Sequence, residues 1–342
     1  MRTRSWALAA IAVLAALMRP LAGAEATAAV YRHITHLGWV VRDAEATAAA
    51  WRRLGVSDIG PARQERIDLE VNGAPAPMRI TRIAAQLGTL RVDWIQPLDA
   101  SGPYRAFLER HGEGVHHLGV AVLDAPAFDT ELAAFGAAGA GVTARGASTP
   151  SSASPNSARF AWLETATPGG LTLELEQGAA VAAPGSTNEE PFNRVTQFAF
   201  VVRDVAAVSR HLARFGFAGL VIEPNVSLDR RYRGAPAGFE MLLGWNRTGE
   251  VPFEWIQSTR GPNVYEEYLA AHGEGFHHLG LDVPDMDAAL ARLTARGLAV
   301  TMSGAWNVRG YEGRFAYLDT ERTGGVTIEL LWNKPRSATH AD

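Results

Sequence analysis

Eight polar residues recur at fixed spacings on stretches of the chain that are otherwise apolar, and all eight have side chains that can bind a metal ion. An offset of 161 residues relates three of the four pairs, and an offset of 155 relates the last. A buried carboxylate is costly unless it is paired or binds a cation, so donors that recur on apolar strands favour metal sites. The predicted ligands are His36, Asp93, His117 and Glu174 in the first half, and Gln197, Glu254, His278 and Glu329 in the second.

The side chains in this set indicate a borderline or hard divalent ion. Imidazole, carboxylate and amide groups together suit Zn, Ni, Co, Mn, Fe or Mg, and the chain has no cysteine that could supply a thiolate. Such an ion can act as a Lewis acid on the oxygens of a small substrate while a carboxylate moves a proton. We assign that catalytic role to Glu174 and Glu329.

Two of the predicted ligands belong to a stretch that occurs twice, as residues 111–119 and 272–280, with the pattern His-Gly-Glu-Gly-x-His-His-Leu-Gly. The second histidine of each His-His pair aligns with a donor on the preceding strand at an offset of 81 residues. Strict alternation along a strand would send the first histidines, His116 and His277, to the opposite face, so we expect them to be structural or to support a ligand. The glutamate of each Gly-Glu-Gly loop is expected to cap a turn.

Four units with one common pattern must position these residues. They begin at His36, His117, Gln197 and His278, and each runs from an apolar strand through an aspartate into an Ala-rich segment that stops near a glycine. Aspartate is a favoured helix N-cap and glycine a common helix stop. The alternating stretches and glycine turns that follow indicate antiparallel strands. The sequence therefore predicts an α+β fold of four tandem βαβββ modules.

The repeats also predict the domain organisation. We expect a first domain over residues 30–178 and a second over residues 193–333, each with two modules, joined by an Ala/Gly/Pro-rich linker at 179–192. A polar loop at 149–157 accounts for the shorter offset near the end and could be a lid or a solvated loop. The modules can pair as first with second and third with fourth, or as first with fourth and second with third. Either arrangement completes two four-donor sets.

Composition and the first residues bear on location and partners. The chain is 47% hydrophobic with a formal charge of −4 and has no basic block, which argues against nucleic-acid binding. Two arginines, a 13-residue apolar run and Ala22-Gly23-Ala24 form the pattern of a signal peptide over residues 1–24. We therefore expect a periplasmic or secreted protein, not membrane-bound after cleavage, that acts on a small molecule as a monomer or homodimer.

The four units resemble the vicinal oxygen chelate superfamily, which includes glyoxalases, bleomycin resistance proteins and extradiol dioxygenases. The His-His-Leu-Gly stretch and the Leu-Glu-Leu-Glu-Gln ending at 173–177 are similar to those of methylmalonyl-CoA epimerase and related glyoxalase-like proteins. The resemblance implies modules paired into two cup-shaped half-barrel sheets. It also implies a metal held by His36, Asp93, His117 and Glu174, while the Gln/Glu/His/Glu order of the second set resembles eukaryotic glyoxalase I.

The resemblance implies a metal-dependent isomerase, epimerase or lyase that stabilises an enolate or alkoxide of a small oxygenated substrate. A ring-cleaving non-haem iron dioxygenase is a rival interpretation, because His36, His117 and Glu174 form a two-histidine, one-carboxylate set. Asp93 argues against this rival by filling a position that such enzymes leave open. The sequence is also compatible with a metal-free binding protein and with a chain in which only one half is active.

Overall fold

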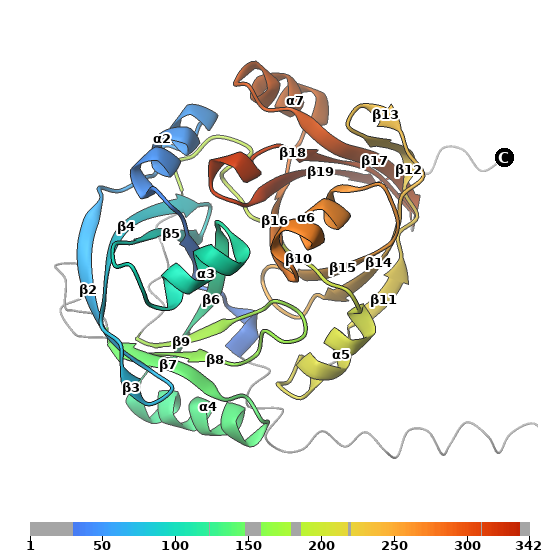
Figure 1. The fold of residues 1–342 in the computed structure, drawn as a ribbon. Helices are drawn as coiled ribbons and strands as arrows, with labels where there is room; N and C mark the ends of the chain where they lie inside the picture. Colours follow the sequence, from blue (N-terminus) through green and yellow to red (C-terminus); the bar gives the residue numbers. More distant parts are fainter. Residues whose placement is uncertain are drawn as a thin grey trace, which may run out of the picture.

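The protein has an α+β fold with two curled sheets side by side, one from each half of the chain (Figure 1). The computed structural model describes residues 30–122, 124–147, 159–178, 186–217, 220–308 and 310–335. The predicted signal peptide and the predicted lid loop lie outside the described residues, as does part of the predicted linker. Among the described helices, none is long and apolar enough to cross a membrane.

The first sheet is a closed barrel. Its strands are β1 (His36–Val40), β2 (Arg63–Val71), β3 (Ala74–Pro75), β4 (Met78–Leu87), β5 (Leu90–Pro97), β6 (Gly114–Val122), β7 (Val142–Ala147), β8 (Arg159–Leu163) and β9 (Leu173–Gln177). They pair in the order β3-β2-β4-β5-β1-β6-β9-β8-β7, and β2 also pairs with β7. That additional pairing closes the ring, so the first sheet goes beyond the half-barrel that the resemblance implied.

The second sheet repeats this arrangement without the closing pairing. Its strands are β10 (Gln197–Val201), β11 (Val221–Pro224), β12 (Leu228–Tyr232), β13 (Ala235–Pro236), β14 (Glu240–Asn246), β15 (Phe253–Arg260), β16 (Gly275–Asp282), β17 (Val300–Val308), β18 (Tyr311–Leu318) and β19 (Thr327–Pro335). The order is β11-β14-β15-β10-β16-β19-β18-β17-β12-β13. β11 and β12 pair with opposite ends of this order, although only residues 225–227 separate them along the chain.

Strand pairing settles which modules combine. β1 of the first module lies antiparallel to β6 of the second, and β10 of the third lies antiparallel to β16 of the fourth. Each first strand also runs parallel to the last strand of its own module, β5 or β15. The modules are therefore paired as first with second and third with fourth, and the predicted fold class is confirmed.

Aspartates begin four of the helices, as predicted. The helices are α2 (Ala44–Leu54), α4 (Ala125–Ala137), α5 (Val205–Ala213) and α7 (Met286–Ala295). The carboxylates of Asp43, Asp124, Asp204 and Asp285 each accept a hydrogen bond from the backbone N–H three residues later, which satisfies one of the free N–H groups at a helix start. These helices cover the outer faces of the two sheets (Figure 1).

Two further helices, α3 (Pro103–His111) and α6 (Val264–His272), were not anticipated by the sequence analysis. Each connects the two modules of one half, and Figure 1 shows each lying across one end of its own sheet. Tyr104 and Leu108 of α3 are buried in a hydrophobic cluster with residues of the barrel interior such as Val40 and Ile95. Val264 and Tyr265 of α6 are buried in the corresponding cluster of the second half. These helices therefore help to enclose the two interiors.

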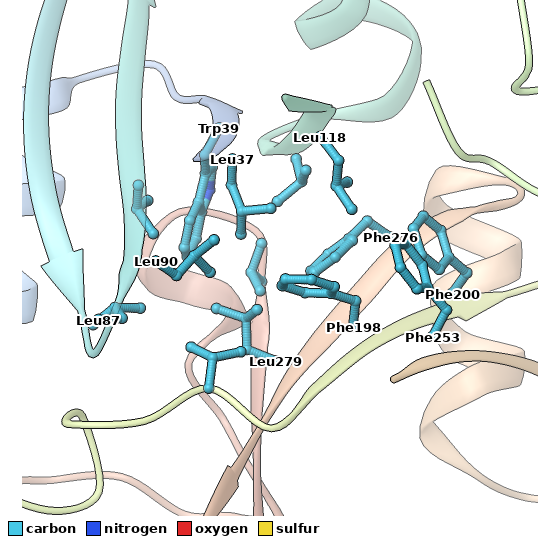
Figure 2. Close-up of a cluster of buried hydrophobic side chains, with 14 of the residues drawn as sticks. Leu37, Trp39, Leu87, Leu90, Leu118, Phe198, Phe200, Phe253, Phe276 and Leu279 are labelled. Carbon is cyan, nitrogen blue, oxygen red and sulfur yellow. The ribbon is translucent and has the colours of Figure 1, made fainter. Parts of the chain in front are cut away.

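A third hydrophobic cluster joins the two halves. Leu37 and Trp39 of β1 and Phe198 and Phe200 of β10 are fully buried in it. Figure 2 shows side chains of the first sheet facing Phe198, Phe276 and other side chains of the second. Side chains alternate along a strand, so Leu37 and Trp39 enter this shared core while His36 and Val40 point into the barrel.

Polar contacts across the junction follow the same pseudo-symmetry. The Nδ1 atom of His111 lies 2.9 Å from the carbonyl oxygen of His272, and the Nδ1 atom of His272 lies 2.6 Å from the carbonyl oxygen of His111. His272 also places Nε2 2.9 Å from Glu321 Oε1. Both ring nitrogens of His272 therefore face acceptors, an arrangement that favours the imidazolium and raises the pKa of His272.

We predict that Phe198→Ala lowers the free energy of unfolding by about 3–5 kcal/mol, because it removes a large side chain from the core shared by both halves. Denaturant unfolding followed by circular dichroism measures the change. Val221→Ala is the matched control, since Val221 is 53% exposed and should change stability by less than about 0.5 kcal/mol. A small effect of Phe198→Ala would contradict a shared core.

We predict a pH-dependent contribution from His272. Its folded-state pKa is raised above the ordinary value of about 6.5, so its stabilising effect is complete below that pH and is lost as the pH rises through the raised pKa. The difference in unfolding free energy between wild type and His272→Gln should be larger at pH 6 than at pH 9. An equal difference at both pH values would argue that Glu321 does not hold the imidazolium.

Candidate metal centres

The eight predicted ligands form two groups, one inside each sheet. We call His36, Asp93, His117 and Glu174 the first site, and Gln197, Glu254, His278 and Glu329 the second site. All eight side chains are buried. Each site takes its residues from four neighbouring strands, which are β5, β1, β6 and β9 in the first half and β15, β10, β16 and β19 in the second.

Small residues make room for the imidazoles of the first site. Gly38 faces His117 across the β1–β6 pair, and Gly119 faces His36. A Cβ atom added to Gly38 would lie 1.9 Å from the His117 ring, and one added to Gly119 would lie 1.9 Å from the His36 ring. Both glycines are therefore required if the rings are to lie flat over the strands and turn their nitrogens toward each other.

The first site contains a compact set of three ligands. His36 Nε2 lies 3.1 Å from Glu174 Oε1, and His117 Nε2 lies 3.4 Å from Glu174 Oε2. One ligand atom from each of these residues lies within 4.8 Å of the other two, the only such group of His, Asp or Glu in the described part of the chain. This is the spacing that a single metal ion requires of neighbouring ligands.

The electrostatics of this set suit a metal ion. Burial lowers the pKa of His117 to about 4, so the imidazole is neutral at physiological pH and has a free lone pair. Burial opposes the ionisation of Glu174, but His117, His36 and the Trp162 hydrogen bond outweigh it and lower its pKa. Neutral imidazole and ionised carboxylate are the protonation states that metal binding needs.

Asp93 lies in the same barrel but is held by arginines. Its Oδ2 atom accepts from Arg82 Nη1 at 2.8 Å and lies 3.3 Å from Arg91 Nε. Arg82 also donates through Nε to Glu65 at 3.0 Å. Burial would raise the pKa of Asp93, but the charges of Arg91, Arg82 and His36 lower it instead. Asp93 is thus ionised and paired, and it does not belong to the three-ligand group.

The second site brings all four predicted residues together. Gln197 Nε2 donates to Glu254 Oε2 and lies 3.3 Å from His278 Nε2. His278 Nε2 lies 3.1 Å from Glu329 Oε2 and 3.9 Å from Glu254 Oε2. Burial, and then the charge of Glu329, raise the pKa of Glu254 well above its ordinary value. These side chains therefore form one cluster with two carboxylates around one imidazole.

Glu329 provides a test of whether an ion fits the second site. The 3.1 Å contact with His278 does not have hydrogen-bond geometry, and Glu329 Oε2 has no hydrogen-bond partner among the described residues although it is buried. An orphaned buried carboxylate oxygen is costly unless a cation or proton compensates it. The donor set and this oxygen together fit a divalent ion.

The histidines that precede the ligands are not on the opposite face, so that expectation was wrong. β6 has a register shift where Gly38 pairs with His117 but Trp39 pairs with Val115, which leaves His116 in a β-bulge. His116 consequently packs inside the barrel, with its Nδ1 atom 3.0 Å from His117 Nδ1. His277 lies in an equivalent bulge of β16, 2.8 Å from His278 Nδ1. Each supports the ligand that follows it.

Glu113 and Glu274 hold the loops that lead into these strands, in agreement with the predicted turn role. Glu113 accepts from the backbone N–H of Arg42, and Glu274 accepts from that of Arg203. Each contact ties a Gly-Glu-Gly loop to the end of the neighbouring first strand. The two carboxylates therefore fix where β6 and β16 begin and do not act as ligands.

The sequence analysis missed two aromatic residues that contact the ligands. Trp162 donates through Nε1 to Glu174 Oε2 at 2.6 Å, and Tyr317 packs edge-on against His278 with 5.0 Å between ring centroids. These residues are separated by 155, the same offset as Glu174 and Glu329, and that offset was the signal that could have found them. A cavity of about 1070 Å³ lined by Trp162 and His116 lies beside the first site and reaches Tyr268 of the second half.

A family model described as the Glyoxalase/Bleomycin resistance protein/Dioxygenase superfamily matches residues 35–191 and again 196–317. The chain belongs to this superfamily. No curated protein matches the chain. The predicted resemblance is therefore confirmed, and the two matches correspond to the two halves that each hold one sheet and one candidate site.

Solved structures share the fold at low sequence identity. A triple mutant of 4-hydroxymandelate synthase from Streptomyces coelicolor is 17% identical, with a TM-score of 0.58 over 90% of this chain and 94% of that chain. A fusion of a xylose isomerase-like TIM barrel with 4-hydroxyphenylpyruvate dioxygenase is 14% identical, with a TM-score of 0.53 over 91% and 50%. A Mn(II)-bound glyoxalase from Novosphingobium aromaticivorans is 14% identical, with a TM-score of 0.50 over 88% and 82%.

The prediction of a divalent metal cofactor is confirmed by the family, by the manganese-bound neighbour and by the His36, His117 and Glu174 group. The structure places seven of the eight predicted ligands in direct contact with another member of their site. Asp93 is the exception, because its carboxylate is bound by arginines. The assignment of an ion to each site remains a prediction.

We predict that the chain binds one divalent ion at each site. His117→Ala and His278→Ala should each lower the metal content of the reconstituted protein by about one ion per chain, and the double variant should bind none tightly, because each histidine is central to its cluster. Elemental analysis after gel filtration measures this. His33→Ala is the control, since the side chain of His33 is 51% exposed. Unchanged metal content in either single variant would remove that site.

Proposed function

We propose that the protein is an exported, divalent-metal-dependent isomerase, epimerase or lyase that acts on a small oxygenated substrate at the second site. The observation that carries this proposal is the pair of buried carboxylates, Glu254 and Glu329, around His278. Two carboxylates match the charge of one divalent ion, and Gln197 adds a neutral oxygen donor. When bound there, the ion supplies a Lewis acid for a substrate carbonyl or pair of oxygens.

The residues of the second site divide the work of proton transfer. Glu254 receives a hydrogen bond from Gln197, which fixes its orientation. Glu329 keeps one buried oxygen without a hydrogen-bond partner in the described part of the chain, so it can accept a proton from the carbon next to a bound carbonyl. Return of that proton to the other face would be epimerisation, return to a neighbouring atom isomerisation, and loss of a leaving group a lyase reaction.

The wider setting of this activity rests on the sequence. The signal pattern of residues 1–24 supports a periplasmic or secreted protein, and a substrate that occurs outside the cytoplasm. The lack of a basic block supports a small-molecule substrate and not a nucleic acid. We propose a monomer or homodimer in solution, because each site is completed by residues of one chain.

A second candidate function belongs to the first site. Because arginines bind Asp93, the remaining ligands are His36, His117 and Glu174, and a two-histidine, one-carboxylate set is typical of non-haem iron oxygenases. This removes the objection that Asp93 fills an open position. Oxygen consumption by the iron-loaded protein with a catechol panel would favour this function over the isomerase or lyase.

We predict that the metal-loaded protein catalyses deuterium exchange at carbons next to a carbonyl or hydroxyl group. A panel of small hydroxy- and oxo-acids and aldehydes in D2O, followed by NMR, detects the exchange without knowledge of the final product. Glu329→Gln should slow exchange at least about 100-fold, as expected for loss of a general base. Glu240→Gln, which changes an exposed glutamate on β14, should have no effect.

Two results would count against the proposed function. The first is exchange that survives Glu329→Gln in protein with a full complement of metal. The second is less than about 0.1 ion per chain after reconstitution, which is too little for a structured site and would favour a metal-free binding protein.

A further inference from the structure

The two sites are related by the repeat but differ in what surrounds their first carboxylate. Asp93 and Glu254 occupy equivalent places, because Asp93 pairs with Ala84 across β4–β5 and Glu254 pairs with Trp245 across β14–β15, both at the offset of 161. The same register places Leu243 at the position of Arg82. At the offset of 161, Pro252 stands where the first half has Arg91. The two arginines that bind Asp93 thus have apolar counterparts.

Arg82 is well placed to hold Asp93. It sits on β4 between Glu65 of β2 and Asp93 of β5, and it bonds to both through different nitrogens. A guanidinium bound on two sides by carboxylates has little freedom to turn away. The neighbouring carboxylates also raise the pKa of Arg82, so it stays charged. The carboxylate of Asp93 is compensated without a metal ion.

We propose that Arg82 withholds Asp93 from the first site, so that the two halves hold ions of different coordination. The first site binds its ion through His36, His117 and Glu174 alone. The second site uses Gln197, Glu254, His278 and Glu329. This inference rests on metal binding by both sites and does not depend on the isomerase or lyase activity.

The difference has a consequence for the ligands that each ion accepts. The ionisable groups in contact at the first site are Glu65, Asp93 and Glu174, with Arg82 and Arg91 opposite, which sum to −3 + 2 = −1. The two glutamates of the second site sum to −2. A divalent ion at the first site therefore keeps a net positive charge and an extra open position. Both features favour an anionic oxygen ligand such as a carboxylate.

Manganese can test this with a readout other than catalysis. His278→Ala leaves the first site to bind Mn(II), and His117→Ala leaves the second. Electron paramagnetic resonance of free Mn(II) gives the affinity, and water-proton relaxation reports the water bound to the ion. We expect more bound water at the first site than at the second. Oxalate should displace that water more readily at the first site.

Exchange of one residue between the halves tests the role of Arg82 directly. In the His278→Ala background, Arg82→Leu copies the second half and should release Asp93 to the ion, tightening Mn(II) binding by about tenfold and removing about one bound water. Arg79→Leu is the matched control, because Arg79 lies on the same strand but pairs with Asp99 outside the site. In the His117→Ala background, Leu243→Arg should weaken binding by about tenfold.

The proposal fails if the two sites bind the same amount of water, or if Arg82→Leu folds normally and changes neither affinity nor bound water. It also fails if His278→Ala protein binds no Mn(II). Should Arg82→Leu not fold, the comparison of the two single-site variants still decides the matter, because it leaves every arginine in place. Loss of deuterium exchange alone would overturn the proposed activity and leave this inference intact.

Discussion

A carboxylate buried inside a sheet needs a compensating charge, and the two halves of this protein meet that need differently. Moving a carboxylate out of water is strongly unfavourable unless a cation or a set of hydrogen bonds replaces the water. In the first half, Arg82 and Arg91 provide the positive charge for Asp93. In the second half, Glu254 and Glu329 share one histidine, and burial together with the charge of Glu329 pushes the pKa of Glu254 upward. The protein therefore has one carboxylate that is already neutralised and one pair that a metal ion would neutralise.

The backbone determines how closely these groups can approach. The rings of His36 and His117 occupy the space that a side chain at Gly119 or Gly38 would fill, so the first site depends on two residues without side chains. The β-bulge at His116 has a related effect, because it places two adjacent histidines on the inner face of one strand. Local departures from regular strand structure thus position more polar groups inside the barrel than alternation alone would allow.

Much of the fold could be predicted from the sequence because it is repeated. Asp43, Asp204 and the two His-His stretches recur at a single offset, and repetition fixes the order of strands and helices without any knowledge of tertiary contacts. The pairing of modules could not be predicted, because both arrangements complete the same two ligand sets. Helix α3 was missed because nine residues are too few to show a clear helical period.

The site was predicted as far as residue types allowed, and the failures have physical causes. The inner position of His116 depends on a bulge, which the pattern of apolar residues does not reveal. The capture of Asp93 depends on Arg82, eleven residues away on an adjacent strand, and a lone arginine on a strand resembles a solvated surface residue. Its significance appears only when Leu243 is placed at the same register in the second half.

The shared core explains how two such different sites can persist in one chain. Leu37, Trp39, Phe198 and Phe200 point away from the sites and pack against one another between the sheets. A substitution on the inner face, such as arginine for leucine on β4, changes the charge of one site without altering that junction. The strand alternation that separates His36 from Leu37 therefore separates the residues that hold the halves together from those that can diverge. Duplication provided two copies of the interior, and this separation allowed one to acquire an internal cation while the other kept its carboxylates free for a metal ion.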